Sequence, residues 1–302
     1  MPALKRLYKE KGTLGILEWI YDKKRFIFIK YFLKTIFLVM PYETILKLNA
    51  AYDNKIAIKG FSASTREYLS DLNIGINIQT PLETSGPALI FGNHPTGLDP
   101  FIIASCLNRE DVYIVADIYQ KNKGKNIGKQ IIPITYARTK KNLYNRGFLN
   151  TIGFYAMRQL TGYSKPDEVR IQNKETIERA AQLLKDGHVV IIFPDGGSNN
   201  PELWYNGIGE IITHSSEKRK SIQLYAAQIT GISTAKIIRH FLFDRRSYLK
   251  NNPLKVTLSQ PFTLEKLNIE NENKSNIITE RLREEFITHS LWIPNYAYNK
   301  SS

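Results

Sequence analysis

The stretch HVVIIFP, residues 188–194, holds five apolar residues in a row between a histidine and a proline. A strand with one face in water alternates apolar and polar residues, whereas a strand covered on both faces is apolar throughout. This segment therefore predicts a strand inside a sheet that has helices on both of its faces. Residues 165–187, directly before it, hold an amphipathic helical pattern that ends at Gly187, a residue type that commonly ends helices.

Other apolar segments continue this alternation along the chain. They predict strands at 87–92, 112–117, 129–137, 221–232 and 254–262. Residues 99–107 predict a helix with Pro100 in its first turn, and a last helix is expected within 271–302. Strands that alternate with helices are typical of α/β proteins. We expect an α/β fold with a central mixed, mostly parallel sheet flanked by helices, and an N-terminal helical segment at a membrane interface.

The charge of the chain favours an anionic partner. Its 302 residues include 42 Lys and Arg against 28 Asp and Glu, a formal net charge of +14. Nucleic acid, an anionic membrane surface and phosphorylated or CoA-type substrates all fit that balance. The single cysteine, Cys106, excludes a disulfide framework within the chain.

The sequence divides into a basic helical region, residues 1–80, and a domain of residues 81–302. The most apolar run, residues 26–40, is interrupted by Lys30 and Lys34. It is shorter than the roughly 20 uninterrupted apolar residues that a helix needs to cross a bilayer. No cleavage pattern of a signal peptide follows it.

Three lysines of this N-terminal region, Lys23, Lys30 and Lys34, share one face of a helix. Lysines on one side and large apolar residues on the other are typical of a helix that lies in a membrane interface. The expected location is therefore peripheral, on the cytoplasmic side of a membrane with an anionic surface. The alternative is a helix that packs on the protein's own core and keeps its lysines at the rim.

The segment GNHPTGLDP, residues 92–100, places His94 after a predicted strand and Asp99 near the start of a predicted helix. A turn through Thr96 and Gly97 can bring the aspartate back to the imidazole. A carboxylate on one ring nitrogen fixes the tautomer and leaves the other nitrogen free to take a proton from a hydroxyl. The alternative is an aspartate that caps the helix and a histidine that only occupies a turn.

The segment FPDGG, residues 193–197, ends the most apolar strand. Open α/β sheets bind ligands at the carboxyl ends of their strands, and glycines let a ligand approach the backbone. An ordinary turn explains the same residues when they are considered alone.

Taken together, NHPTGLD at 93–99 and DGHVVIIFPDGG at 186–197 resemble the glycerolipid acyltransferase family, which includes lysophosphatidic acid and glycerol-3-phosphate acyltransferases. The first motif of that family, Asn-His-x4-Asp, is matched by residues 93–99. Its third motif, Phe-Pro-Glu-Gly, is matched by residues 193–196 with Asp195 in place of the glutamate. Its second motif, a strand followed by an arginine, is matched loosely by IIPITYARTKK at 131–141. The resemblance spans about residues 80–262.

The resemblance implies an acyl transfer from acyl-CoA or acyl carrier protein to the hydroxyl of a glycerolipid, with 1-acyl-glycerol-3-phosphate as the expected acceptor. It makes His94 the general base and Asp99 the residue that orients it, without a metal or a resident cofactor. The partners it implies are the acyl donor, the lipid acceptor and a membrane surface, and not nucleic acid. The substrate-binding residues it implies are Asn93, Thr96, Gly97, Arg138, Lys140, Phe193, Pro194, Asp195, Gly196, Gly197 and Ser198.

The sequence departs from the family pattern after the third motif. The arginine that commonly stands there is absent, and the segment reads Gly197, Ser198, Asn199, Asn200. Arg138, helped by Lys140 or Lys141, would then bind the phosphate of the acceptor. An acceptor without a phosphomonoester stays open, because the serine and the asparagines offer neutral hydrogen bonds.

Two rival interpretations come from other classes of protein. A nucleic-acid-binding protein fits the charge but leaves both motifs unexplained. A catalytically silent membrane-binding relative conflicts with the presence of both His94 and Asp99.

The segment GKNIGKQ, residues 124–130, lacks the spacing and the Ser or Thr of a P-loop and predicts a mobile basic loop. None of the five histidines has the spacing of a zinc site.

Overall fold

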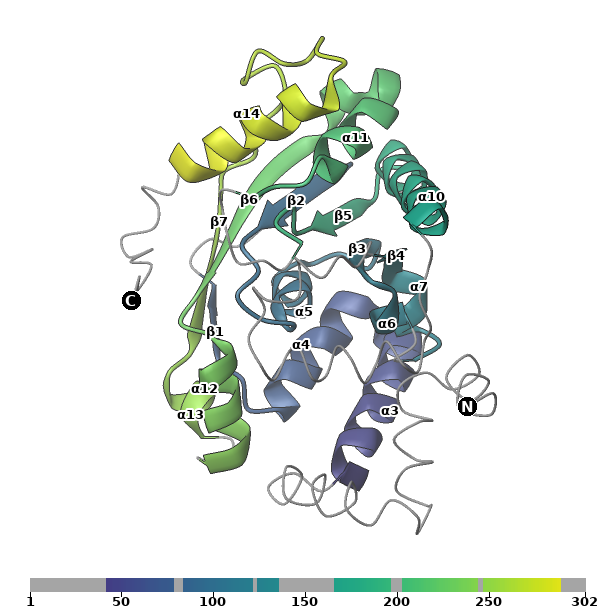
Figure 1. The fold of residues 1–302 in the computed structure, drawn as a ribbon. Coiled ribbons are helices and arrows are strands. Elements are labelled where there is room, and N and C mark those ends of the chain that lie inside the picture. The colour runs from purple at the N-terminus through teal and green to yellow at the C-terminus, as the bar shows by residue number, and fades with distance from the viewer. Residues whose placement is uncertain are drawn as a thin grey trace.

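The computed structural model describes residues 42–78, 84–121, 124–135, 166–196, 203–243 and 247–288 (Figure 1). Within them, seven strands form one sheet in the order β1-β7-β6-β2-β5-β3-β4. Along the chain the strands are β1 (Ile76–Ile78), β2 (Ala88–Gly92), β3 (Val112–Asp117), β4 (Ile131–Ile134), β5 (Val189–Ile192), β6 (Gln223–Thr230) and β7 (Leu254–Leu258).

The sheet is mixed and mostly parallel, as the sequence predicted. Strands β6, β2, β5, β3 and β4 run parallel to one another. Strand β7 pairs antiparallel with β6, and β1 pairs parallel with β7. The carboxyl ends of five strands therefore meet along one edge of the sheet, where α/β proteins of this kind bind their ligands.

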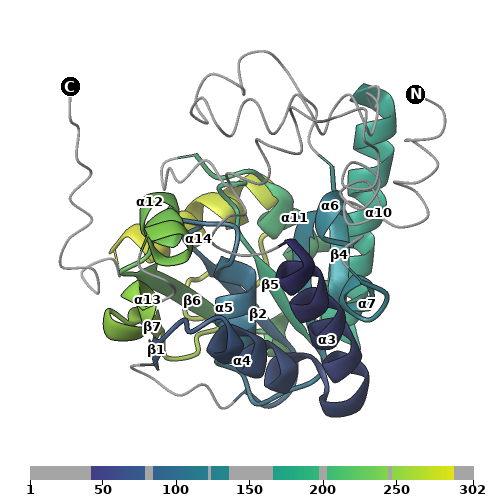
Figure 2. The ribbon, with the colours of Figure 1, turned by 90° about the horizontal axis from the view of Figure 1, so that it is seen from below.

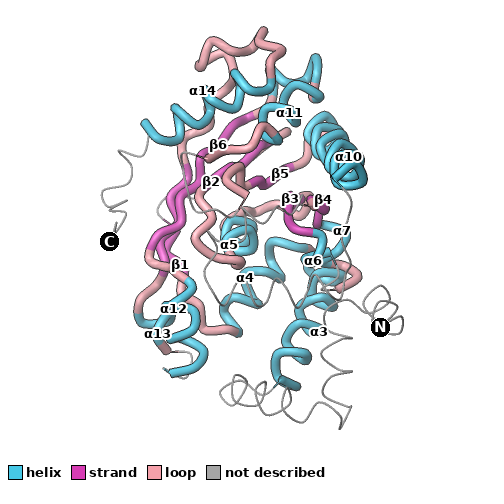
Figure 3. The backbone as a smooth tube through the Cα atoms, in the orientation of Figure 1, coloured by secondary structure: helices cyan, strands magenta, loops and turns pink. Residues whose placement is uncertain are grey.

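Helices cover both faces of the sheet (Figures 1 and 2). One face carries α3 (Tyr42–Lys59), α4 (Phe61–Asp71) and α5 (Asp99–Ser105), and the other carries α10 (Pro166–Lys185), α11 (Gly207–His214) and α14 (Ser275–Thr288). Shorter elements complete the described chain, as the tube in Figure 3 shows: α6 (Ile118–Lys121), α7 (Ile127–Gln130), the 3-10 turn η2 (Ser216–Ser221), α12 (Thr234–Ile238), the π-helical turn η3 (Arg239–Phe243) and α13 (Tyr248–Asn251).

The core lies in two layers, one on each face of the sheet. Successive side chains of a strand point to opposite faces. Ile90 of β2 accordingly packs with α4 and α5, while its neighbours Leu89 and Phe91 pack with α11 and α14. All four residues of β5 are buried, which confirms the strand covered on both faces.

Residues 42–78 pack on the same core as the strands that follow them. Phe61 and Leu69 of α4 are buried in the layer that holds Ile90, and β1 is a member of the sheet. No helix among the described residues is long and apolar enough to cross a membrane. The predicted interfacial segment 26–40, with its lysines, lies outside the described residues.

The prediction of a loop at 124–130 was wrong for residues 127–130, which are helical. Residues 127–130 form α7, and Asp53 of α3 holds the start of this turn. The Asp53 carboxylate accepts hydrogen bonds from the backbone N–H groups of Asn126 and Ile127, both at 2.8 Å. The partner is distant in sequence, so the local pattern of glycines and lysines gave no sign of it.

Candidate active site

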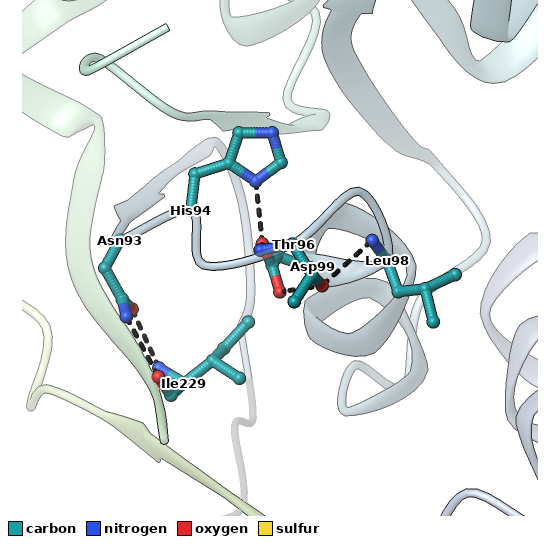
Figure 4. A network of polar contacts seen from close by, with 6 residues as sticks. All are labelled: Asn93, His94, Thr96, Leu98, Asp99 and Ile229. Carbon is teal, nitrogen blue, oxygen red and sulfur yellow. Dashed lines mark hydrogen bonds and ion pairs between the residues drawn. The ribbon is translucent and has the colours of Figure 1, made fainter. Parts of the chain in front are cut away.

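His94 lies in the loop that follows β2, at the carboxyl edge of the sheet (Figure 4). The strand ends at Gly92, where β2 and β6 come very close. A Cβ atom at Gly92 would lie 2.3 Å from the carbonyl oxygen of Ala227 in β6. Only glycine fits this approach, so the chain leaves the sheet at a fixed point directly before His94.

The structure brings His94 and Asp99 together. Nδ1 of His94 lies 2.7 Å from Oδ2 of Asp99, and the other ring nitrogen points away from the carboxylate (Figure 4). The side chain of Asp99 is fully buried, whereas that of His94 is 23% exposed. The pair therefore has one member inside the protein and one at the surface of the site. The predicted pairing is present, and the catalytic roles stay predictions.

Asp99 receives two further hydrogen bonds from its own loop. The backbone N–H of Thr96 donates to Oδ2 at 2.6 Å, and the Thr96 hydroxyl donates to Oδ1 at 2.8 Å. Burial raises the pKa of the Asp99 carboxyl above its ordinary value, and the hydrogen bonds from His94 and Thr96 oppose that rise. Three donors on two oxygens match an ionised carboxylate, which only accepts.

The alternative role for Asp99 as a helix cap does not hold. The N-cap position of α5 is Leu98, and no side chain caps the helix there. Asp99 is instead the first residue of α5, and its carboxylate turns back to the loop. Thr96 is buried with it, while Gly97 is exposed with open space beside it.

Asn93, expected to bind substrate, ties the loop to β6. Its side-chain amide donates to the carbonyl oxygen of Ile229 at 2.9 Å and accepts from the N–H of Ile229 at 2.8 Å (Figure 4). Both polar atoms of the side chain are thus engaged with one residue of the backbone. This geometry favours a positioning role beside His94.

The third motif lies beside the first because β5 is the neighbour of β2. The ring of Phe193 stacks on the ring of His94, with centroids 4.6 Å apart. The turn after it closes with a hydrogen bond from the N–H of Gly196 to the carbonyl of Phe193 at 3.1 Å. Gly196 has φ of 59°, a conformation that suits glycine. Pro194 and Asp195 are buried in this turn.

A cavity of about 650 Å³ opens next to this turn. It lies between α10, the start of α11 and the carboxyl ends of β3, β4 and β5. Phe193, Pro194 and Gly196 line it, so the third motif contacts both His94 and the cavity. Two basic residues of α10, Arg170 and Lys174, line it as well. Neither residue was predicted as a binding residue, because in the sequence both look like the solvated face of an ordinary amphipathic helix.

Four predicted binding residues lie outside the described residues: Arg138, Lys140, Gly197 and Ser198. Lys141, Asn199 and Asn200 lie outside them too. Within the described part of the chain, no group of three or more His, Cys, Asp or Glu side chains could hold a metal ion.

The arrangement suits the removal of a proton from a hydroxyl. When the Nδ1–H group of His94 donates to Oδ2 of Asp99, the lone pair of Nε2 is left for the site. When that nitrogen takes a proton, the adjacent carboxylate stabilises the imidazolium.

A family model and one solved structure are similar to this chain. Residues 73–216 match the model of the family described as Acyltransferase. No curated protein matches the chain. A solved structure similar to it is that of the 1-acyl-sn-glycerophosphate (LPA) acyltransferase PlsC from Thermotoga maritima, with a TM-score of 0.37 and 12% identity over 94% of this chain and 96% of that one.

The matched segment 73–216 includes the loop of His94 and Asp99, the third motif and α10. It therefore contains both motifs on which the resemblance to glycerolipid acyltransferases depends, and this segment of the chain is similar to the acyltransferase family.

Proposed function

We propose that this protein transfers a fatty acyl group from acyl-CoA or acyl carrier protein to the hydroxyl of a glycerolipid, with 1-acyl-glycerol-3-phosphate as the leading acceptor. The observation that carries the proposal is the hydrogen bond of 2.7 Å between His94 and the buried Asp99. It leaves one ring nitrogen free at the carboxyl edge of the sheet, beside a cavity large enough for part of a lipid.

The proposed step transfers one acyl group and one proton. Nε2 of His94 takes the proton of the acceptor hydroxyl as its oxygen attacks the thioester carbonyl. The carbon–sulfur bond then breaks, and His94 returns the proton to the leaving thiolate. A general base contributes about 10²–10⁴-fold to such a reaction. No resident cofactor or metal takes part in this proposal.

Because the proposed acceptor is a lipid, we also propose a peripheral location on the cytoplasmic side of an anionic membrane. In this proposal Lys23, Lys30 and Lys34 interact with the headgroups. The net charge of +14 supports such a surface, because Lys and Arg are attracted to anionic lipids.

The test is the transfer rate of His94→Ala with 1-acyl-glycerol-3-phosphate and an acyl-CoA, next to a matched histidine variant. His188 also pairs with a carboxylate, with Nδ1 3.0 Å from Oδ2 of Asp111, but it precedes β5 at the opposite edge of the sheet. We expect His94→Ala to lose at least about 10²-fold in rate and His188→Gln to keep it.

A folded His94→Ala protein that keeps most of its rate would overturn the mechanism. An acceptor panel then tests the substrate: if wild type ignores 1-acyl-glycerol-3-phosphate and acylates a neutral or zwitterionic lyso-lipid, the acceptor is wrong and the chemistry stands.

A further inference from the structure

The cavity beside the third motif has an apolar floor. Five aliphatic side chains from three strands and two helices form this floor: Val115, Ile134, Ile177, Ile192 and Ile208. They come from β3, β4, α10, β5 and α11 and belong to, or pack against, the core layer on that face of the sheet. An apolar part of a ligand would therefore lose its contact with water on this floor.

Two cations of α10 stand at the same cavity. Arg170 and Lys174 are four residues apart, so they lie one turn from each other on one side of the helix. Arg170 makes no hydrogen bond or ion pair with the described part of the chain. Among the residues that the structure describes, Lys174 pairs with Glu178 alone, with Nζ 3.8 Å from Oε1 and both side chains mostly exposed. Such exposed pairs contribute little, so both cations are available to a ligand.

Asn173, a polar residue of the same wall, is engaged within the protein. The side-chain amide of Asn173, between the two cations, accepts from the N–H of Thr135 at 2.9 Å and donates to its carbonyl at 2.7 Å. Glu210 is the single carboxylate among the described lining residues. Arg170 and Lys174 outweigh it, so the described wall favours an anion.

We infer that this cavity binds the phosphate-bearing part of a substrate, with the phosphate on Arg170 and Lys174 and the adjoining apolar part on the floor. A guanidinium presents paired donors that match phosphate oxygens, and an ammonium adds a point charge. The inference rests on the proposed function for its substrate, because Phe193 lines the cavity and also stacks on His94. The arginine that commonly follows the third motif is absent after Gly196, and these two cations supply positive charge in its place.

The phosphate belongs either to the lyso-lipid acceptor or to the CoA of the donor, and its chemistry is the same in both.

The experiment measures equilibrium binding of four single ligands: a short-chain 1-acyl-glycerol-3-phosphate below its micellar concentration, the monoacylglycerol with the same chain, CoA, and pantetheine. The proteins are wild type, the double variant Arg170→Gln/Lys174→Gln, and a control, Arg179→Gln/Lys185→Gln. The control removes the same charge from the same helix at residues outside the cavity wall.

We expect the double variant to bind one phosphate ligand about tenfold more weakly or worse, since hydrogen bonds to charged groups are stronger than those between neutral groups. The phosphate-free counterpart should bind as before, and the control should bind all four ligands like wild type. The affected pair of ligands identifies the source of the phosphate. Unchanged phosphate binding, or an equal loss for the phosphate-free ligand, overturns the inference.

Failure of the inference and failure of the proposed function give different results. Normal acyl transfer by wild type together with unselective binding contradicts the phosphate site alone. Selective loss of phosphate binding in a protein that transfers no acyl group contradicts the proposed reaction alone.

Discussion

The ring of Phe193 lies on the ring of His94, with centroids 4.6 Å apart and 26° between the planes. Residues far apart in sequence meet here because β2 and β5 are adjacent, with Phe91 opposite Ile192. Asp99 holds one edge of the imidazole and Phe193 covers one face. The orientation of the ring is thus fixed before a substrate arrives.

Phe193→Leu should lower the rate while leaving the fold in place. Leucine keeps most of the apolar volume, but it lacks the aromatic face that attracts the imidazolium formed during transfer. Attraction of a cation to an aromatic face contributes about 0.5–2 kcal/mol, so kcat should fall about 2- to 30-fold. Phe193→Tyr keeps the ring and should retain more of the rate. Equal kcat values for the leucine variant and wild type, measured on proteins with similar Tm, would contradict this role.

Asp99→Asn should separate activity from stability. An asparagine oxygen in place of Oδ2 still accepts from His94 and Thr96, and its NH₂ group can donate to the Thr96 hydroxyl. The loop should therefore keep its shape, but the negative charge beside the imidazolium is gone. We expect kcat to fall by about 10²–10⁴-fold with Tm equal to or above that of wild type. A variant that unfolds, or one that stays fully active, would contradict this assignment.

The same substitution predicts how stability depends on pH. Burial raises the pKa of Asp99, so the folded protein binds this proton more tightly than the unfolded chain. Stability from a raised carboxyl pKa is present at low pH and is lost as the pH rises from the ordinary carboxyl range through the raised value. Across that range, the unfolding free energy of Asp99→Asn minus that of wild type should increase with pH. A decrease of this difference with pH would contradict the raised pKa.

Much of the sheet could be predicted from the sequence, because buried strands leave long apolar runs. Strand β3 begins and ends where the sequence predicted it, at 112–117. Strand β1 was missed, since three residues with an asparagine in the middle carry too little pattern. Helix α11, GIGEIITH, was also missed. Its Gly209 allows contact with α14, where a Cβ atom would lie 1.9 Å from the carbonyl oxygen of Ser275.

In the site too, some features follow from residues close in sequence, and others depend on segments that only the fold brings together. The pairing of His94 with Asp99 followed from five residues of spacing and one turn. The stack of Phe193 on His94 required knowledge of the strand order. The cations of the cavity wall belong to no motif, and only the packing of α10 over the sheet brings Arg170 to the same cavity as Gly196.

Charge reversal at Lys23, Lys30 and Lys34 should weaken binding to anionic vesicles. These residues lie outside the described part of the chain, and the prediction follows from their spacing and charge. Each lysine near such a surface contributes about 1 kcal/mol. Co-sedimentation with anionic and with neutral vesicles measures the effect. Reversal of the exposed lysines Lys250, Lys255 and Lys266 changes the net charge equally and serves as the control. Equal losses in both triple variants would show that net charge alone attracts the membrane.

Asn93→Ala should cost both stability and rate, because it unties the His94 loop from β6. Ile229 is 2% exposed, so its N–H and carbonyl would stay buried without their partners. Each unsatisfied group costs about 1–3 kcal/mol, which urea unfolding measures. Asn173→Ala is the matched variant, since that side chain holds Thr135 through the same two bonds. Its loss should lower stability less, because Thr135 is partly exposed and water can replace the lost bonds.

The two asparagine variants should differ in kcat. Asn93 is next to His94 in sequence, and a shift of about 1 Å in a catalytic group can cost 10²-fold in rate. Asn173 has no bond to the His94 loop, so kcat should fall less in that variant, although KM can change because the residue lines the cavity. If Asn93→Ala loses stability but keeps the kcat of wild type, the bond to Ile229 only supports the fold. His94 would then be positioned by Asp99 and Phe193 alone.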